Sequence, residues 1–240
     1  MSIDAFTSRP ARTAGLGDTA LDLGLRRYML SVYNYMAGGL GLTGLVAYIA
    51  IATGLYQQIA GTPLIWVVML APLAAVLFLS FRIDRLSFAT AQTIFWIYAA
   101  MMGLSLAGLL LVYTGTSVAR VFFISAGTFA AMSLYGYTTG RDLSRLGSFL
   151  FMGLIGIVLA GVVNIFIASS ALQLAISVIG VLVFTGLTAY DTQRIKEIYL
   201  TGRARSDLGK VALMGALTLY LDFINLFVML LQLTGTRRER

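Results

Sequence analysis

The strongest candidates for proton or metal chemistry in this chain are carboxylates, because its 240 residues contain no histidine and no cysteine. That absence removes histidine metal ligands, serine–histidine dyads and thiolates in one step. Ten acids remain, and most of them lie in polar loops or tails. The exceptions are Asp191 and Asp222, which stand beside or inside strongly apolar segments. These two residues are therefore the candidates for function.

Asp222 lies near the middle of the apolar stretch TLYLDFINLFVMLLQL, residues 218–233. A charged side chain at the centre of a bilayer costs at least about 2.5 kcal/mol and usually marks a functional site. A second interpretation is that this carboxylate only joins helices through hydrogen bonds, for instance to Asn225 on the same helix face. For Asp191 the second interpretation is a solvated residue at a helix end, beside Arg194.

Two carboxylates that approach each other in a low-dielectric site cannot both ionise cheaply, so they would share a proton and act as a proton-sensitive latch. Such a pair also attracts a hard divalent cation such as calcium. Calcium takes about six to eight oxygens, so Asp191 and Asp222 would supply only part of the set. Tyr190 and Asn225 are candidate hydrogen-bond donors to the pair, because each is near one aspartate in the sequence.

The elements that must position these residues follow from composition. The chain is 59% hydrophobic and 11% charged, with a mean hydropathy of +0.88, which excludes a water-soluble globular protein. A helix needs about 20 mainly apolar residues to cross a bilayer. Runs of about that length occur at residues 31–55, 64–81, 88–113, 121–138, 148–168, 171–190 and 211–233.

These runs are longer than the strands of a membrane barrel and apolar on every face. They predict an all-α polytopic membrane protein with seven transmembrane helices. We expect a flexible cytoplasmic tail at residues 1–30, a transmembrane domain at 31–233 and a short basic tail at 234–240.

Positive charge predicts the orientation of the chain. Basic residues concentrate in the N-terminal tail and in the loops on the same side, so the positive-inside rule places the N-terminus in the cytoplasm. Anionic lipid headgroups account for the net charge of +7 without a nucleic-acid partner. The tail TRRER opposes the rule if the last run crosses completely, and the alternative is that this run re-enters. We expect it to cross.

Three segments together resemble the Bax inhibitor-1 family, also called the transmembrane Bax inhibitor motif family, in its bacterial branch. They are TFAAMSLYGYTTGRDLSRLGSFLFMGLIGIVLAGVVNIF (128–166), LTAYDTQRIK (187–196) and LTLYLDFINLFVMLLQL (217–233). The resemblance implies six helices around a central seventh and a pH-sensitive calcium leak of the bacterial inner membrane.

The resemblance also implies roles for single residues. The aspartates of AYDTQ and LDF form a di-aspartyl sensor in the family, and they correspond to Asp191 and Asp222. Some relatives latch the closed state through an arginine of the second helix. In this chain the available candidate is Arg82, at the end of the second run.

Two functions stay open at this point. The first is the calcium leak, whose partners are the lipid bilayer, calcium and protons, with calcium as the transported or bound ion and no required cofactor. The alternative is a non-conducting regulator that binds a membrane protease or another membrane protein through segments 139–146 and 191–210. We expect no enzyme activity. The two aspartates resemble those of presenilin-like proteases, but the GxGD and PAL motifs of those enzymes are missing.

Overall fold

The computed structural model describes residues 11–202 and 207–238, with side chains from residue 21 onward. The first ten residues of the expected N-terminal tail and the last two of the C-terminal tail lie outside the described residues. The described chain is helical: α1 Ala11–Ala52, α2 Leu55–Ala60, α3 Leu64–Arg82, η1 Ile83–Arg85, α4 Phe88–Val112, α5 Gly115–Thr138, α6 Ser144–Ile167, α7 Ser170–Leu200 and α8 Leu208–Thr234.

Seven of these helices are long and apolar enough to cross a membrane, as the seven hydropathic runs predicted. Two boundaries differ strongly from the runs. Helix α1 begins at Ala11 and not near residue 31, so it extends into the segment expected as a flexible tail. Helix α7 continues to Leu200, ten residues past the expected end of its run. In both places charged residues interrupt the apolar run, although the backbone stays helical.

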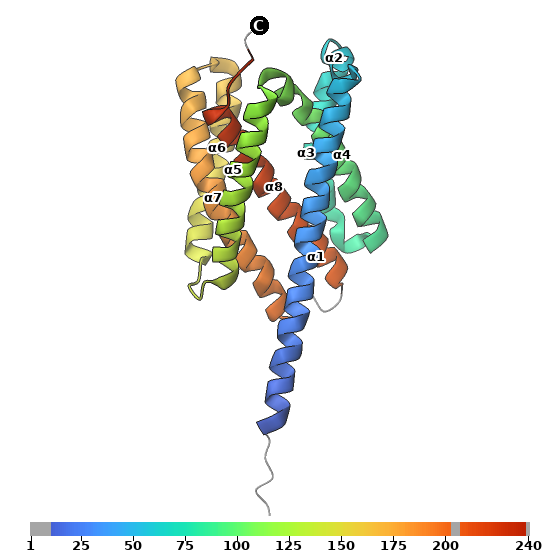
Figure 1. Ribbon diagram of the computed structural model, residues 1–240, viewed down its shortest axis with the longest axis vertical. Helices are drawn as coiled ribbons and strands as arrows, with labels where there is room; N and C mark the ends of the chain where they lie inside the picture. Colours follow the sequence, from blue (N-terminus) through green and yellow to red (C-terminus); the bar gives the residue numbers. More distant parts are fainter. Residues whose placement is uncertain (1–10, 203–206, 239–240) are drawn as a thin grey trace, which may run out of the picture.

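The helices cross the bundle in alternating directions (Figure 1). We call the end at which α1 begins the basal end; it carries η1, the connection 139–143, the end of α7 and the start of α8. The opposite, distal end carries α2, the turn at 113–114 and the segment 235–238 that follows α8. Helix α8 therefore runs through the whole bundle, as we expected of the last apolar run.

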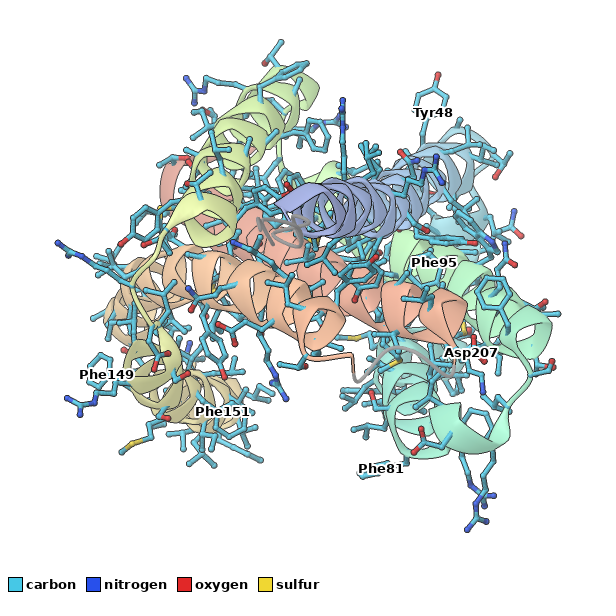
Figure 2. All side chains as sticks on the ribbon, turned by 90° about the horizontal axis from the view of Figure 1, so that it is seen from below. Tyr48, Phe81, Phe95, Phe149, Phe151 and Asp207 are labelled. Atoms are coloured by element: carbon cyan, nitrogen blue, oxygen red, sulfur yellow. The ribbon has the colours of Figure 1, made fainter. Side chains whose placement is uncertain are left out.

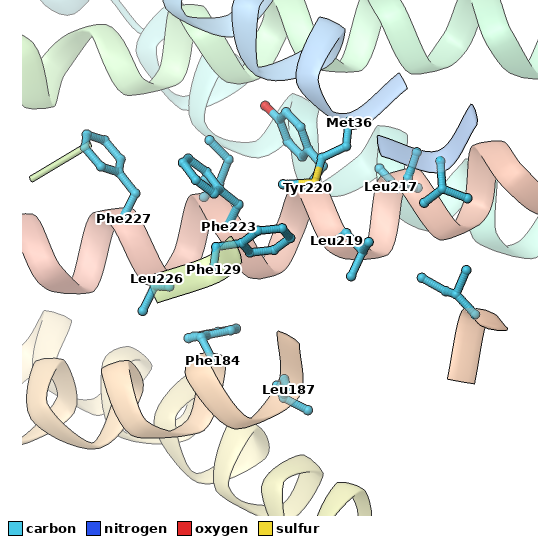
Figure 3. Packing of buried hydrophobic residues seen from close by; sticks show 14 of the residues in the cluster. Met36, Phe129, Phe184, Leu187, Leu217, Leu219, Tyr220, Phe223, Leu226 and Phe227 are labelled. Carbon is cyan, nitrogen blue, oxygen red and sulfur yellow. The ribbon is translucent and has the colours of Figure 1, made fainter. Parts of the chain in front are cut away.

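Helix α8 is the most buried of the seven long helices. In the most apolar 18-residue stretch of α8, 67% of the residues are buried, compared with 11–39% in the corresponding stretches of the other six helices. It packs on α1, α4, α5 and α7, whereas α3 packs mainly on α4 and α6 on α7. Figure 3 shows side chains of α8 lying between Met36 of α1 and Phe184 of α7.

The outer helices turn large apolar side chains outward. Tyr48, Phe81, Phe149 and Phe151 project from the bundle in the view from the basal end (Figure 2), and each is at least 59% exposed. Phe95, by contrast, is fully buried. Exposure of aromatic and aliphatic side chains over several helices is typical of a surface that lipid covers.

The C-terminal segment after α8 is attached to the turn between α4 and α5. The Thr114 N–H donates to the Thr236 carbonyl at 3.0 Å, and the Arg238 N–H donates to the Val112 carbonyl at 2.9 Å. The Ser117 hydroxyl accepts from the Thr236 N–H at 2.9 Å. These bonds fix the distal end of α8 against two neighbouring helices.

Ser117→Ala is expected to lower the free energy of unfolding by about 1 kcal/mol, because it leaves the Thr236 N–H without its acceptor. The matched control is Ser125→Ala, on the same buried face of α5. The Ser125 hydroxyl donates only to the Val121 carbonyl of its own helix, so its loss should change stability by less than about 0.5 kcal/mol. Thermal unfolding of both variants in one detergent compares them. Equal midpoints would mean that the C-terminal attachment contributes nothing measurable.

Candidate functional site

Four consecutive residues of α7 point in four directions, because successive residues of a helix are about 100° apart. The ring of Tyr190 lies against Gly147 of α6. Asp191 faces a cavity beside α8. The hydroxyls of Thr192 and Ser133 of α5 share a hydrogen bond of 2.9 Å. The fourth residue, Gln193, reaches the α5–α6 connection. The four side chains of the YDTQ sequence thus face α6, the cavity beside α8, α5 and the α5–α6 connection, in that order.

Gln193 holds the basal connection between α5 and α6 with both ends of its amide. Its Oε1 accepts from the Leu143 N–H at 2.9 Å, and its Nε2 donates to the Arg141 carbonyl at 2.8 Å. Beside it, Asp142 accepts from the Ser144 N–H at 2.8 Å. Hydrogen bonds from the Ser144 side chain and backbone lower the pKa of the Asp142 carboxyl. The connection is therefore ordered by the Gln193 amide of α7 and by the hydrogen bond between Asp142 and Ser144.

Glycines allow the close approach of α7 to α5 and α6. A Cβ at Gly136 of α5 would collide with the Ala189 carbonyl and Cα, and one at Gly147 would collide with the Tyr190 ring. Small residues at helix crossings allow such contacts within membranes. Gly136 and Gly147 both lie in the segment 128–166 that carried the family resemblance.

Helix α8 is positioned by polar and aromatic contacts on both sides of Asp222. The hydroxyls of Tyr220 and Thr43 of α1 share a hydrogen bond of 2.7 Å, and Thr43 also donates to the Ala99 carbonyl of α4 at 2.9 Å. One residue after Asp222, the Phe223 ring packs edge-on against two rings of α5. These contacts set the rotation of α8 that turns Asp222 toward α7.

The structure brings Asp191, Asp222, Tyr190 and Asn225 together around one cavity of about 630 Å³ between α6, α7 and α8. We call it the aspartate pocket. Asp191 is 9% exposed and Asp222 is 5% exposed, and their carboxyl groups are close enough to interact directly. The rest of the lining is largely apolar, with Phe151, Phe184 and Leu187 among it.

Asp191 lies deeper within its helix than the sequence predicted. Asp191 was expected to close its span, and the span 191–210 was expected as a connector, but α7 continues for nine residues beyond Asp191. The pair therefore lies about 14 Å from the basal end of α7 and about 21 Å from that of α8, at 1.5 Å per residue. Ile195 explains the extension, because it is buried and faces Gly215 of α8.

The polar groups around Asp222 leave part of its carboxylate unsatisfied. Its Oδ2 is buried and accepts no hydrogen bond from an N–H or hydroxyl group, so only a proton shared with the neighbouring Asp191 carboxyl would satisfy it. Asn225, suggested by the sequence as a donor to the pair, instead donates to the Leu221 carbonyl of its own helix at 2.8 Å. A buried acceptor without a partner costs about 1–3 kcal/mol. An oxygen left in this condition is available to a proton or a cation.

Sequence reasoning missed Arg194, which lines the aspartate pocket. It also lines a second cavity, of about 830 Å³, at the basal end between η1, α7 and α8. Arg194 thus stands where the two cavities adjoin. The sequence signal that could have identified Arg194 is its position three residues after Asp191, since residues three apart share a helix face. Arg82, the latch candidate, is exposed at the end of α3 and is not among the residues lining the aspartate pocket.

A metal ion resident in the protein would need more donors than the pair provides. Among the described residues, no group of three or more histidine, cysteine, aspartate or glutamate side chains is arranged to hold a metal ion. Asp191 and Asp222 together could offer a passing calcium ion part of its six to eight oxygens, and water or backbone carbonyls would have to complete the set. The two carboxylates alone are therefore an incomplete set of ligands for a calcium ion.

Comparison with known proteins agrees with the motifs around these residues. The model of the family described as inhibitor of apoptosis-promoting Bax1 matches residues 25–239. The chain belongs to this family, the Bax inhibitor-1 family. The resemblance predicted from the three sequence segments is thereby confirmed.

Close relatives of this Bax inhibitor-1 family member are bacterial. An uncharacterised protein of Rickettsia prowazekii is 50% identical over 91% of this chain and 93% of its own. Inner membrane protein YbhL of Escherichia coli K12 is 48% identical over 90% of this chain and 94% of its own. An uncharacterised membrane protein of Streptococcus pyogenes is 37% identical over 90% of this chain and 96% of its own. The similarity therefore covers all seven long helices.

Proposed function

We propose that this protein is a pH-sensitive, calcium-permeable leak of the bacterial inner membrane, gated by Asp191 and Asp222. The observation that carries the proposal is the aspartate pocket: two buried carboxyls on adjacent helices, one of them with an unpartnered oxygen. A site of this kind binds protons and hard cations in competition. Burial of ionisable groups within a membrane is energetically unfavourable, so such groups usually mark a functional site.

The proposed orientation places the basal end in the cytoplasm. Most basic side chains of the described loops and helix ends gather there, including Arg82, Arg85, Arg141, Arg145 and Lys210, whereas the distal end carries Arg120, Arg237 and Arg238. This distribution follows the positive-inside rule. The inner membrane is favoured by the name of the similar protein YbhL.

In the proposed mechanism α8 is the central helix and the other six surround it. Its high burial and its contacts with four helices support this role. When Asp191 and Asp222 share a proton, α8 holds the path closed. A change in protonation shifts the population toward conformers in which the pocket connects with the basal cavity. Because Arg194 lines both cavities, its guanidinium is better placed than that of Arg82 to latch the pair.

The protein's own residues supply the chemistry of this mechanism, and no covalent step is involved. Protons and calcium are the ligands, the lipid bilayer is the surrounding partner, and no cofactor is required. We accordingly infer a transport function and no enzyme activity. Tyr190 and Asn225 contribute by shaping the pocket, with the Tyr190 ring against α6 and the Asn225 amide on its own helix.

Calcium flux into liposomes, measured from pH 5 to 8, tests the proposal. Wild type should conduct with a sigmoidal pH dependence, and Asp222→Asn should lose that dependence, because the amide has the same shape and does not titrate. The matched control is Asp142→Asn. The Ser144 hydrogen bonds lower the pKa of Asp142, so this group stays ionised throughout the range and its loss should leave the profile unchanged.

Two outcomes would overturn the proposal. A wild-type protein that is folded and passes no calcium at any pH excludes the leak. The alternative, a non-conducting regulator of a membrane protease or another membrane protein, would then take its place. An unchanged pH profile in Asp222→Asn would keep the leak and exclude the aspartate pair as its sensor.

A further inference from the structure

A long groove lies between α1 and α5, on the side of α8 that faces away from the aspartate pocket. Its basal half is a cavity of about 770 Å³ lined by α1 and α5. Its distal half, of about 320 Å³, has Phe223 and Phe227 of α8 in its lining. Leu40 lines both halves. Figure 1 shows α1 and α5 on either side of the oblique α8. We call this feature the α1/α5 groove.

The groove exists because α1 and α5 both pack on α8 and not closely on each other. One direct link joins them, a hydrogen bond of 2.6 Å between the hydroxyls of Tyr33 and Ser133. The remaining lining of the basal half is mainly apolar and includes Met29, Leu30 and Phe129. Within a membrane such a groove opens to hydrocarbon, and empty space against apolar side chains would forfeit dispersion contacts. Its natural occupant is therefore an acyl chain.

The length of the basal half matches one leaflet. Fourteen residues of α1 separate Arg26 at its mouth from Leu40, which corresponds to about 21 Å. Half of a bilayer, with its headgroups, measures about 20–22 Å. A phospholipid with its headgroup beside Arg26 would thus end its acyl chain near Leu40.

The mouth of the groove carries one charge of each sign. Asp22 and Arg26 are both exposed, both line the basal half, and lie one helical turn apart. Among the described residues, Lys210 and Asp207 form the only salt bridge, so Asp22 and Arg26 are not paired with each other. A guanidinium suits a phosphate, and a carboxylate suits an ammonium. The headgroup that offers both is the zwitterionic phosphoethanolamine group.

We propose that the α1/α5 groove binds one phosphatidylethanolamine molecule, with its phosphate on Arg26, its ammonium on Asp22 and an acyl chain along the groove to Leu40. This site is independent of the aspartate pair and does not rest on the calcium leak. The bound lipid completes the bundle by filling the space between α1 and α5 over α8.

Lipid retention tests the site. The protein is reconstituted with equal amounts of phosphatidylethanolamine and phosphatidylglycerol and then extracted in mild detergent. Native mass spectrometry counts the lipids that remain bound. Wild type should retain one phosphatidylethanolamine per chain in preference to phosphatidylglycerol. Retention of the two lipids in their input ratio would overturn the headgroup assignment.

Paired variants separate the two parts of the site. Ala130→Trp fills the groove and should abolish retention, whereas Ala131→Trp, at a neighbouring exposed residue outside the groove lining, should not. Asp22→Asn should shift the preference toward phosphatidylglycerol by about tenfold, because one charged hydrogen bond is lost. Asp84→Asn, which also removes one exposed carboxylate at the basal end but lines a different cavity, is the matched control for charge.

The readouts distinguish a failed site from a failed fold. Each variant is compared by circular dichroism and by its melting temperature before lipids are counted. Unchanged retention in a folded Ala130→Trp protein would overturn the groove as the binding site. A preference for phosphatidylglycerol in wild type would mean that Arg26 acts alone and that the occupant is an anionic lipid.

Discussion

Gly136→Ala is expected to destabilise the protein by about 1–3 kcal/mol, although alanine is the better helix former. The new methyl group would collide with the backbone of α7 at Ala189. A backbone carbonyl has no rotamer by which to move aside, so α5 and α7 would have to separate. Because Ala189 is two residues from Asp191, the separation should also disturb the aspartate pocket.

Gly127→Ala is the matched control for this prediction. Gly127 lies on the same helix, and a Cβ there would meet nothing within 4 Å. The substitution should therefore be neutral or stabilise the helix by up to about 1 kcal/mol. Thermal unfolding of both variants in one detergent measures the difference. If Gly136→Ala is as stable as Gly127→Ala, the close approach of α5 to α7 is not a feature of the folded protein.

The seven long helices could be predicted from the sequence because hydropathy is a local property. A run of apolar residues needs no knowledge of its neighbours to be identified as a span. The same reasoning ended the sixth run at residue 190, because the polar and charged stretch DTQRIKE follows it. The helix continues there because Ile195 is buried and packs on Gly215 of α8. That contact is nonlocal, and hydropathy does not contain it.

The candidate site could be predicted only in part for the same reason. Asp222 was identifiable because a carboxylate within an apolar run is conspicuous. Arg194 was not, since many arginines border the apolar runs and only the packing of α7 on α8 selects the one that lines the pocket. The attachment of Thr236 to Ser117 joins residues 119 positions apart and left no sequence signal.

Asp222→Leu is expected to raise the free energy of unfolding by about 1–3 kcal/mol while abolishing the pH dependence of calcium flux. Replacement of buried charged groups by packed apolar side chains is often neutral or stabilising. Here the replaced group has an unpartnered oxygen, and the pocket around it contains Phe184 and Leu187, against which a leucine can pack. Stability and function would then change in opposite directions at one residue.

Asn225→Leu provides the control, one turn further along α8 in the same pocket. Its amide is half-buried and donates only to its own helix, so its loss should change stability by less than about 0.5 kcal/mol. The comparison separates the two interpretations of Asp222. A carboxylate kept for gating is a cost to the fold, and its removal stabilises. A carboxylate kept to join helices contributes to the fold, and Asp222→Leu would then melt well below both wild type and Asn225→Leu.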